Sequence, residues 1–218
     1  MKTWIKRQLL FFCLAAIPTA ILSGGQTAPL MTPPAGTSVA IVLFQDLQWP
    51  ECASAYPIVR EAARAHNIPL VLRDFPLPRH NWSFEAAVNA RYFALQSQQL
   101  GDEFRGYMLQ NQSRISDESE LRSFTERFAE ERQLRLPAII DGEGKLAESV
   151  HQDFLLGQRL GLEHTPTVFV VGNGAVSAAL VGPVNHERLN RMIEQFQTNI
   201  KPVVTSAKTP SRTRSNRR

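Results

Sequence analysis

Cysteine is scarce in this sequence, which has only two, Cys13 and Cys52. Cys13 lies in a short apolar run near the N-terminus, so a chain that has lost this run contains a single thiol. No disulfide can then form within one mature chain. A lone cysteine in an exported protein is buried, paired with another molecule, or reactive.

Long apolar runs are also missing. The longest, residues 9–22, is interrupted by Pro18 and is shorter than the roughly 20 residues that a membrane span needs. It follows a basic lead at residues 1–7 and precedes small residues at 23–25. This order predicts a secretory signal peptide over residues 1–25 and export to the bacterial periplasm. The alternative is an uncleaved segment that anchors the chain in the inner membrane.

Acidic residues are absent from both ends of the chain. Residues 1–25 and 201–218 hold nine of the 24 basic residues, which leaves 15 against 20 acids, or about −5, for residues 26–200. The sequence predicts a basic, disordered tail over 201–218 that could contact an anionic surface. The tail has no aromatic residues for stacking on bases, so no specific nucleic-acid partner is expected.

Metal-ligand spacing is not found either. The five histidines show no paired spacing and have no second cysteine nearby, so we expect no metal site and no cofactor. They are His66, His80, His151, His164 and His186.

Apolar runs and helical periodicity alternate along the rest of the chain and predict an α/β fold. We expect a central mixed four-stranded sheet in one domain over residues 38–200, after an extended lead-in at 26–37. An all-helical insertion is predicted over about 83–135, with breaks near Leu100-Gly101 and Ser113–Asp117. The predicted strands are 39–44, 68–75, 167–171 and 178–181, and the other predicted helices are 52–66, 146–160 and 186–198.

Two apolar stripes are predicted within the insertion. Phe84, Val88, Tyr92 and Leu95 form one at helical spacing, and the segment Leu121–Phe128 carries another with Phe124 between its ends.

Three segments together resemble the DsbA-like branch of the thioredoxin-fold oxidoreductases. The first strand runs through Phe44-x-Asp46 into Trp49-Pro50-Glu51-Cys52, where that family has C-P-x-C. The segment RDFPLPRH at 73–80 precedes an alanine-rich helix, and Thr165-Pro166 precedes an apolar strand. The resemblance covers about Val39–Phe196. It implies a thioredoxin-like fold with a helical subdomain, and thiol-disulfide chemistry on unfolded or partner polypeptides that contain cysteines.

The departure from the family pattern lies at Trp49, which stands where the family has its first cysteine. That cysteine is activated as a thiolate by a helix N-terminus, and the second thiol then resolves the mixed disulfide. Trp49 can do neither, so we expect dithiol chemistry to be lost. Cys52 is either a small buried hydrophobe or a working single thiol. Trp49 either covers Cys52 as an apolar platform or packs on neighbouring loops.

The remaining candidate residues surround this motif. Glu51 would disfavour a thiolate at Cys52 by charge repulsion, although it is also a favourable acid in a first helical turn. Asp46 could assist proton transfer or serve only as a turn residue. The resemblance implies that Thr165-Pro166 is a cis peptide that contacts bound peptide, and that His164 lies beside Cys52. His164 could then lower the thiol pKa, or be a simple exposed loop residue.

The sequence therefore predicts an exported DsbA-like protein, degenerate for dithiol chemistry, that acts through Cys52 alone or by binding peptides. The alternative is a binding module without thiol chemistry, which uses the groove beside Pro166 or the basic tail.

Overall fold

The computed structural model describes residues 31–172 and 174–199 of the chain. The predicted signal peptide at 1–25 and the predicted basic tail at 201–218 lie outside the described residues, as does the first part of the lead-in. Within the described ranges, no helix is long and apolar enough to cross a membrane.

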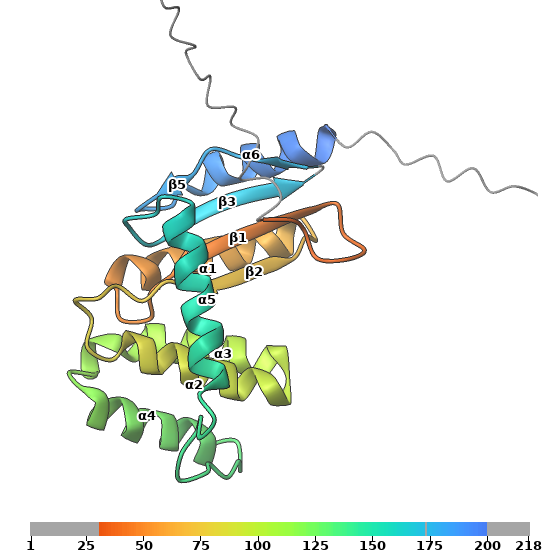
Figure 1. Cartoon of the computed structure of the whole chain (residues 1–218). Coiled ribbons are helices and arrows are strands. Elements are labelled where there is room, and N and C mark those ends of the chain that lie inside the picture. Colours follow the sequence, from red (N-terminus) through yellow and green to blue (C-terminus); the bar gives the residue numbers. More distant parts are fainter. Residues whose placement is uncertain (1–30, 173, 200–218) are drawn as a thin grey trace, which may run out of the picture.

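A mixed sheet forms the centre of the fold (Figure 1). Strand β1 (Val39–Gln45) pairs in parallel with β2 (Leu70–Asp74) on one side and antiparallel with β3 (Thr167–Gly172) on the other. The far edge of β3 pairs with two short strands, β4 (Ala175–Val176) and β5 (Leu180–Val181). The edge strand predicted over 178–181 is present as β5, and β4 is a fifth strand beyond the four predicted, because the chain pairs with the edge of β3, leaves it and returns to it.

Helices cover both faces of the sheet, which explains why β1 is apolar over residues 39–44 and buried throughout. Side chains on one face of β1, such as Ile41, pack with α1 (Pro50–Ala65) and α6 (His186–Thr198). Those on the other face, such as Phe44, pack with α5 (Lys145–Arg159) through Leu156 and with Phe75. The predicted α/β architecture is confirmed.

The predicted helical insertion is present and lies beyond the β2 side of the sheet (Figure 1). It contains α2 (Ser83–Gln96), α3 (Gln98–Asn111), a 3₁₀ turn (Gln112–Arg114) and α4 (Glu118–Glu130). Phe93, Phe104 and Phe128, one from each α-helix, pack together with ring centroids 4.8–5.1 Å apart. Because each ring comes from a different helix, this aromatic cluster holds the insertion together.

Two details of the insertion differ from the sequence predictions. The break predicted near Leu100-Gly101 lies at Ser97, whose side chain caps α3 by accepting a hydrogen bond from the Leu100 amide. Gly101 instead allows α3 to approach α2, since a Cβ there would lie 2.6 Å from the Ala94 Cβ.

The apolar stripe predicted on α2 is also wrong in part. Leu95 is 72% exposed and Phe84 is 40% exposed, whereas the alanines Ala86, Ala87 and Ala90 are buried. The helix lies between other helices, and small side chains let them approach. The stripe predicted on α4 is confirmed, since Leu121, Phe124 and Phe128 are all buried.

A buried ion network joins the insertion to the sheet. The carboxylate of Asp74, at the end of β2, pairs with Arg105 of α3 and with Arg91 of α2. Arg91 also pairs with Asp153 of α5, which accepts hydrogen bonds from the Arg73 side chain at 2.8 Å and the Asp74 amide at 3.1 Å. The network ties β2, α2, α3 and α5 to one another.

Burial alone would raise the pKa of Asp74, but the guanidinium groups of Arg105 and Arg91 outweigh it and hold the pKa below its ordinary value. The carboxylate is therefore charged in the folded protein. Removal of one partner of such a buried pair typically costs about 3–5 kcal/mol, since the other charge is left buried without compensation.

We predict that the stability contribution of Asp74 is lost in acid. The folded pKa lies below the unfolded value of about 3.9, so the contribution is complete above about pH 4 and is lost as pH falls through the folded pKa. Asp74→Asn should lower the free energy of unfolding by about 3–5 kcal/mol at pH 7. Its difference from wild type should shrink as the pH falls below about 4.

Urea unfolding at pH 7, 5, 4 and 3 measures this difference. Glu130→Gln, an exposed change on α4, serves as the control and should stay within about 0.5 kcal/mol of wild type at pH 7. A deficit of Asp74→Asn that is the same at every pH would show that the charge of Asp74 is not the source of its effect.

Candidate functional site

The W-P-E-C segment lies at the start of α1, as its sequence predicts. Trp49 is the N-cap residue with extended backbone angles, and Pro50 opens the helix, where its fixed φ is favourable and its missing amide proton is not needed. Glu51 is an exposed acid in the first turn. Cys52 follows, and its amide donates a hydrogen bond to the Trp49 carbonyl at 3.0 Å.

Cys52 is only 1% exposed. Its sulfur accepts a hydrogen bond from the Asp46 amide at 3.4 Å. Burial raises the pKa of the Cys52 thiol to about 12, because the Asp46 amide and the nearby Thr165 hydroxyl only partly oppose it and the charges of Asp46 and Glu51 add to it. The thiol is therefore neutral near pH 7 and lacks the thiolate that thiol-disulfide exchange requires.

Trp49 is half-buried and held by two basic side chains. Its ring stacks on the His80 ring at 5.4 Å between centroids with 28° between planes. The Arg79 guanidinium lies 4.8 Å from the centroid of the indole ring, within the range of a cation–π contact. Trp49, Arg79 and His80 together form what we call the Trp49 surface.

Asp46 organises the loops beneath the Trp49 surface. One carboxylate oxygen, Oδ1, accepts hydrogen bonds from the Gln48 amide at 2.8 Å and the Ser83 hydroxyl at 2.5 Å. The other, Oδ2, accepts from the Leu77 amide and contacts His80 Nδ1, both at 2.7 Å. Because His80 donates through Nδ1, its ring orientation is set by Asp46, and this orientation in turn supports the stack on Trp49.

Thr165, which precedes Pro166, also lies close to the Cys52 thiol. The peptide bond between them is cis, as predicted from the resemblance. The Pro166 carbonyl accepts a hydrogen bond from the Gly182 amide at 2.9 Å. Gly182 lies close to Glu51, since a Cβ built on it would lie 3.9 Å from Glu51 Oε2. The fold therefore brings Glu51, Cys52, Thr165 and Pro166 together.

His164 has an exposed side chain beside this cluster. Its backbone carbonyl accepts a hydrogen bond from the Thr167 hydroxyl at 2.7 Å. The charged groups that act on the Cys52 thiol are Asp46 and Glu51.

Two residues of the site, Arg79 and His80, were not identified as candidates from the sequence. A signal was available, because both belong to the segment RDFPLPRH, but its likeness to the family gives no indication that the segment folds back onto Trp49. A cavity of about 260 Å³ adjoins His80 and is lined mainly by apolar side chains. They include Leu77, Phe84 and Phe154.

No group of three or more His, Cys, Asp or Glu side chains that could hold a metal ion occurs within residues 31–172 and 174–199.

Comparison with solved structures places this arrangement among similar folds. The thiol-disulfide exchange protein alpha-DsbA2 of Wolbachia pipientis superposes with a TM-score of 0.61 at 18% identity, over 75% of this chain and 84% of that chain. Alpha-DsbA1 of the same organism superposes with a TM-score of 0.64 at 14% identity, over 79% of this chain and 98% of that chain. DsbA2 of Pseudomonas aeruginosa superposes with a TM-score of 0.58 at 17% identity, over 78% of this chain and 94% of that chain.

No curated protein matches the chain. A family model described as thioredoxin matches residues 35–195, which include every element from β1 to most of α6. The chain thus belongs to the thioredoxin family and has the fold of the DsbA-like thiol-disulfide oxidoreductases.

Proposed function

We propose that this protein binds partner polypeptides at the Trp49 surface, beside Pro166, and that it does not carry out dithiol exchange. The observation that carries the proposal is the pair of changes at the helix start. By the resemblance, Trp49 stands where the DsbA-like pattern has its attacking thiol, and the thiol of Cys52 is buried with a pKa of about 12. Such a site would lack a reactive thiol and would still present the ring of Trp49 to a partner.

The chemistry of the Trp49 surface supports a polypeptide partner. A tryptophan that is already held in place loses little conformational freedom on binding, and such residues supply much of the energy at protein interfaces. The apolar cavity next to His80 extends the surface toward Phe84, which is 40% exposed. An extended segment with apolar side chains would fit this combination of a flat ring and a small cavity.

Export is part of the proposal. It rests on the predicted signal peptide at residues 1–25, and the alternative of an inner-membrane anchor concerns the same residues. A solved protein of similar fold, with a TM-score of 0.59 and 14% identity, is described as a periplasmic thioredoxin-like protein from Salmonella enterica serovar Typhimurium. Contact of the basic tail at 201–218 with an anionic surface is a separate part of the proposal.

Single-thiol exchange through Cys52 is the competing function, and thiol labelling separates the two. In a Cys13→Ser chain, we expect an alkylating reagent to label native Cys52 at least about a thousandfold more slowly than the urea-unfolded chain near neutral pH. The raised pKa reduces the thiolate fraction by about that factor, and burial blocks access as well.

The matched control moves the thiol two residues along the same helix. Ser54 is exposed on α1, so Cys13→Ser, Cys52→Ser, Ser54→Cys should label at nearly the same rate in the native and the unfolded chain. Rapid native labelling of Cys52 would favour single-thiol exchange over our proposal.

Dithiol activity should be close to background in wild type and restored by one substitution. Trp49→Cys places a thiol at the N-cap of α1, one turn before Cys52, where the helix N-terminus stabilises a thiolate. We expect a disulfide between the introduced thiol and Cys52, and measurable reduction of insulin by the reduced variant.

Trp49→Ser is the control, since it removes the same ring without adding a thiol. The assay follows insulin precipitation with dithiothreitol as the electron source. Robust turnover by wild type would refute the loss of activity, and failure of the variant to form a disulfide would contradict the assigned position of Trp49.

Binding should depend on the ring of Trp49 and not on the thiol. Loss of a central tryptophan typically costs about 2 kcal/mol or more, so Trp49→Ala should weaken binding of an unfolded, cysteine-blocked polypeptide by about tenfold or more. Cys52→Ala should bind as wild type does. Isothermal titration calorimetry with carboxymethylated α-lactalbumin measures the affinities.

Leu95→Ala is the control for a lost exposed apolar side chain, because Leu95 is 72% exposed on α2. It should leave the affinity unchanged. Equal weakening by Leu95→Ala and Trp49→Ala would mean that binding is not located at the Trp49 surface.

A further inference from the structure

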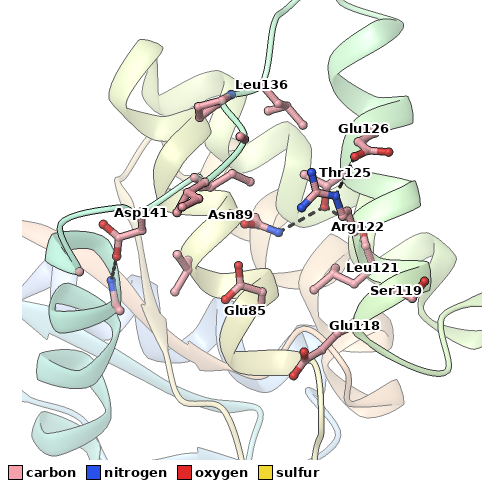
Figure 2. A pocket seen from close by; sticks show the side chains of 17 residues that line it. Glu85, Asn89, Glu118, Ser119, Leu121, Arg122, Thr125, Glu126, Leu136 and Asp141 are labelled. Atoms are coloured by element: carbon pink, nitrogen blue, oxygen red, sulfur yellow. Dashed lines mark hydrogen bonds and ion pairs between the residues drawn. The ribbon is translucent and has the colours of Figure 1, made fainter.

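A second, larger cavity lies within the helical insertion and shares no residue with the Trp49 surface. Its volume is about 570 Å³. Side chains from α2, α4 and the start of α5, together with the segment 136–141, form its walls (Figure 2). A cavity of this size is large enough for an amino-acid side chain.

The walls of this cavity combine apolar and acidic groups. Val88 and Leu121 are buried side chains that line the cavity. Leu136, Ile139 and Ile140 of the segment 136–141 line it as well. Four carboxylates and one guanidinium also line it, an excess of three negative charges. The carboxylates are Glu85, Glu118, Glu126 and Asp141, and the guanidinium is Arg122.

Arg122 does not pair with Glu85 or Glu118. Arg122 pairs with Glu126 of its own helix at 2.9 Å. Glu85 has no hydrogen-bond or ion-pair partner among residues 31–172 and 174–199, and neither does Glu118. Burial raises the pKa of Glu85, and the charges of Glu118 and Asp141 add to the rise. The local field therefore favours a cation beside Glu85.

Asn89 gives an independent indication of a ligand. Its side chain is on α2, one turn after Glu85, and the residue is only 3% exposed. Its amide nitrogen donates to the Thr125 hydroxyl at 3.3 Å, while its oxygen Oδ1 is buried without a donor in the described part of the chain. Figure 2 shows the Glu85 carboxylate and the Asn89 amide side by side on the cavity wall.

An exchange of the Asn89 amide oxygen and nitrogen would not remove this unpaired acceptor. The Thr125 hydroxyl already donates its proton to the Leu121 carbonyl at 2.8 Å, so toward Asn89 it can only accept. The amide nitrogen must therefore face Thr125, which leaves Oδ1 in need of a donor from outside. Buried polar groups without a partner are rare in folded proteins and call for such an explanation.

We infer that the cavity binds a lysine or arginine side chain of a polypeptide. The ammonium or guanidinium group would lie between Glu85 and Asn89, donate to Oδ1 and offset the excess negative charge. The aliphatic stem would pack on Val88, Leu121 and Ile139. An organic cation is favoured over a metal ion, because no side chains in the described ranges form a metal-binding group there.

Titration with short peptides tests this inference. The probe is acetyl-Gly-Arg-Gly-amide, compared with the uncharged acetyl-Gly-Gln-Gly-amide and with free L-arginine. We expect the arginine peptide to bind at least tenfold more tightly than the glutamine peptide and to shift the NMR signal of the Asn89 side-chain amide. Tighter binding of the peptide than of L-arginine would identify the source as a polypeptide, and the reverse would identify a free amino acid.

Glu85→Gln should weaken binding of the arginine peptide about tenfold. It should leave the fold intact, since Glu85 lies at an exposed position of α2. Glu194→Gln on α6 makes the same charge change away from the cavity and should have no effect. Both are measured in the full chain and in a chain whose six basic residues at 201–218 are glutamine. Tighter peptide binding in the latter would mean that the protein's own tail competes for the cavity.

Equal affinities for the arginine and glutamine peptides in both chains would overturn the inference. Unchanged binding in Glu85→Gln would overturn it as well. Asn89→Leu offers a second check, because it fills the site of the unpaired oxygen with an apolar group and should abolish the difference between the two peptides.

Discussion

The buried carboxylate of Asp46 is the interaction on which the site depends. It accepts hydrogen bonds from two backbone amides and the Ser83 hydroxyl and contacts the His80 ring, and these groups lie up to 37 residues from it along the chain. Hydrogen bonds to a charged group contribute about 1.5–3 kcal/mol each. A single side chain thus joins the loop after β1, the segment before α2 and the start of α2.

This constraint explains how the site around Trp49 keeps a defined shape. Asp46 orients His80, His80 stacks on Trp49, and the backbone of Trp49 receives a further hydrogen bond from the Gln112 side chain at 3.3 Å. The ring of Trp49 is thus held by the segment before α2, and its backbone is held by the helical insertion. A surface held in this way loses little conformational entropy when it binds a partner, and this is the physical basis of the proposed recognition.

The architecture could be predicted from the sequence because strands, helices and caps depend on neighbouring residues. The surroundings of Trp49 could not, since Arg79 and His80 reach it only through the fold of the loop that Asp46 holds. The buried face of α2 was misassigned for a similar reason. Helical periodicity predicts that the large apolar residues of α2 are buried, but in the structure its alanines are buried against the neighbouring helices. The cavity beside Asn89 has no sequence signal, because the segment 136–141 that closes it has neither helical nor strand periodicity.

Asp46 and Asp74 lie at the neighbouring ends of β1 and β2, and they show how its surroundings determine the structural role of a buried carboxylate. Asp74 ends β2 and is paired in register with Gln45, the residue before Asp46, because β1 and β2 are parallel. Arginines surround Asp74, so its pKa is lowered and its charge fastens the insertion to the sheet. Asp46 instead accepts hydrogen bonds from amides, a hydroxyl and an imidazole. Its hydrogen bonds therefore fix the conformation of loops and do not join helices. The parallel pairing of β1 and β2 therefore places Asp74, which supports the insertion, next to Asp46, which supports the Trp49 surface. A partner bound at Trp49, as proposed, would contact loops that are anchored beside the helical insertion.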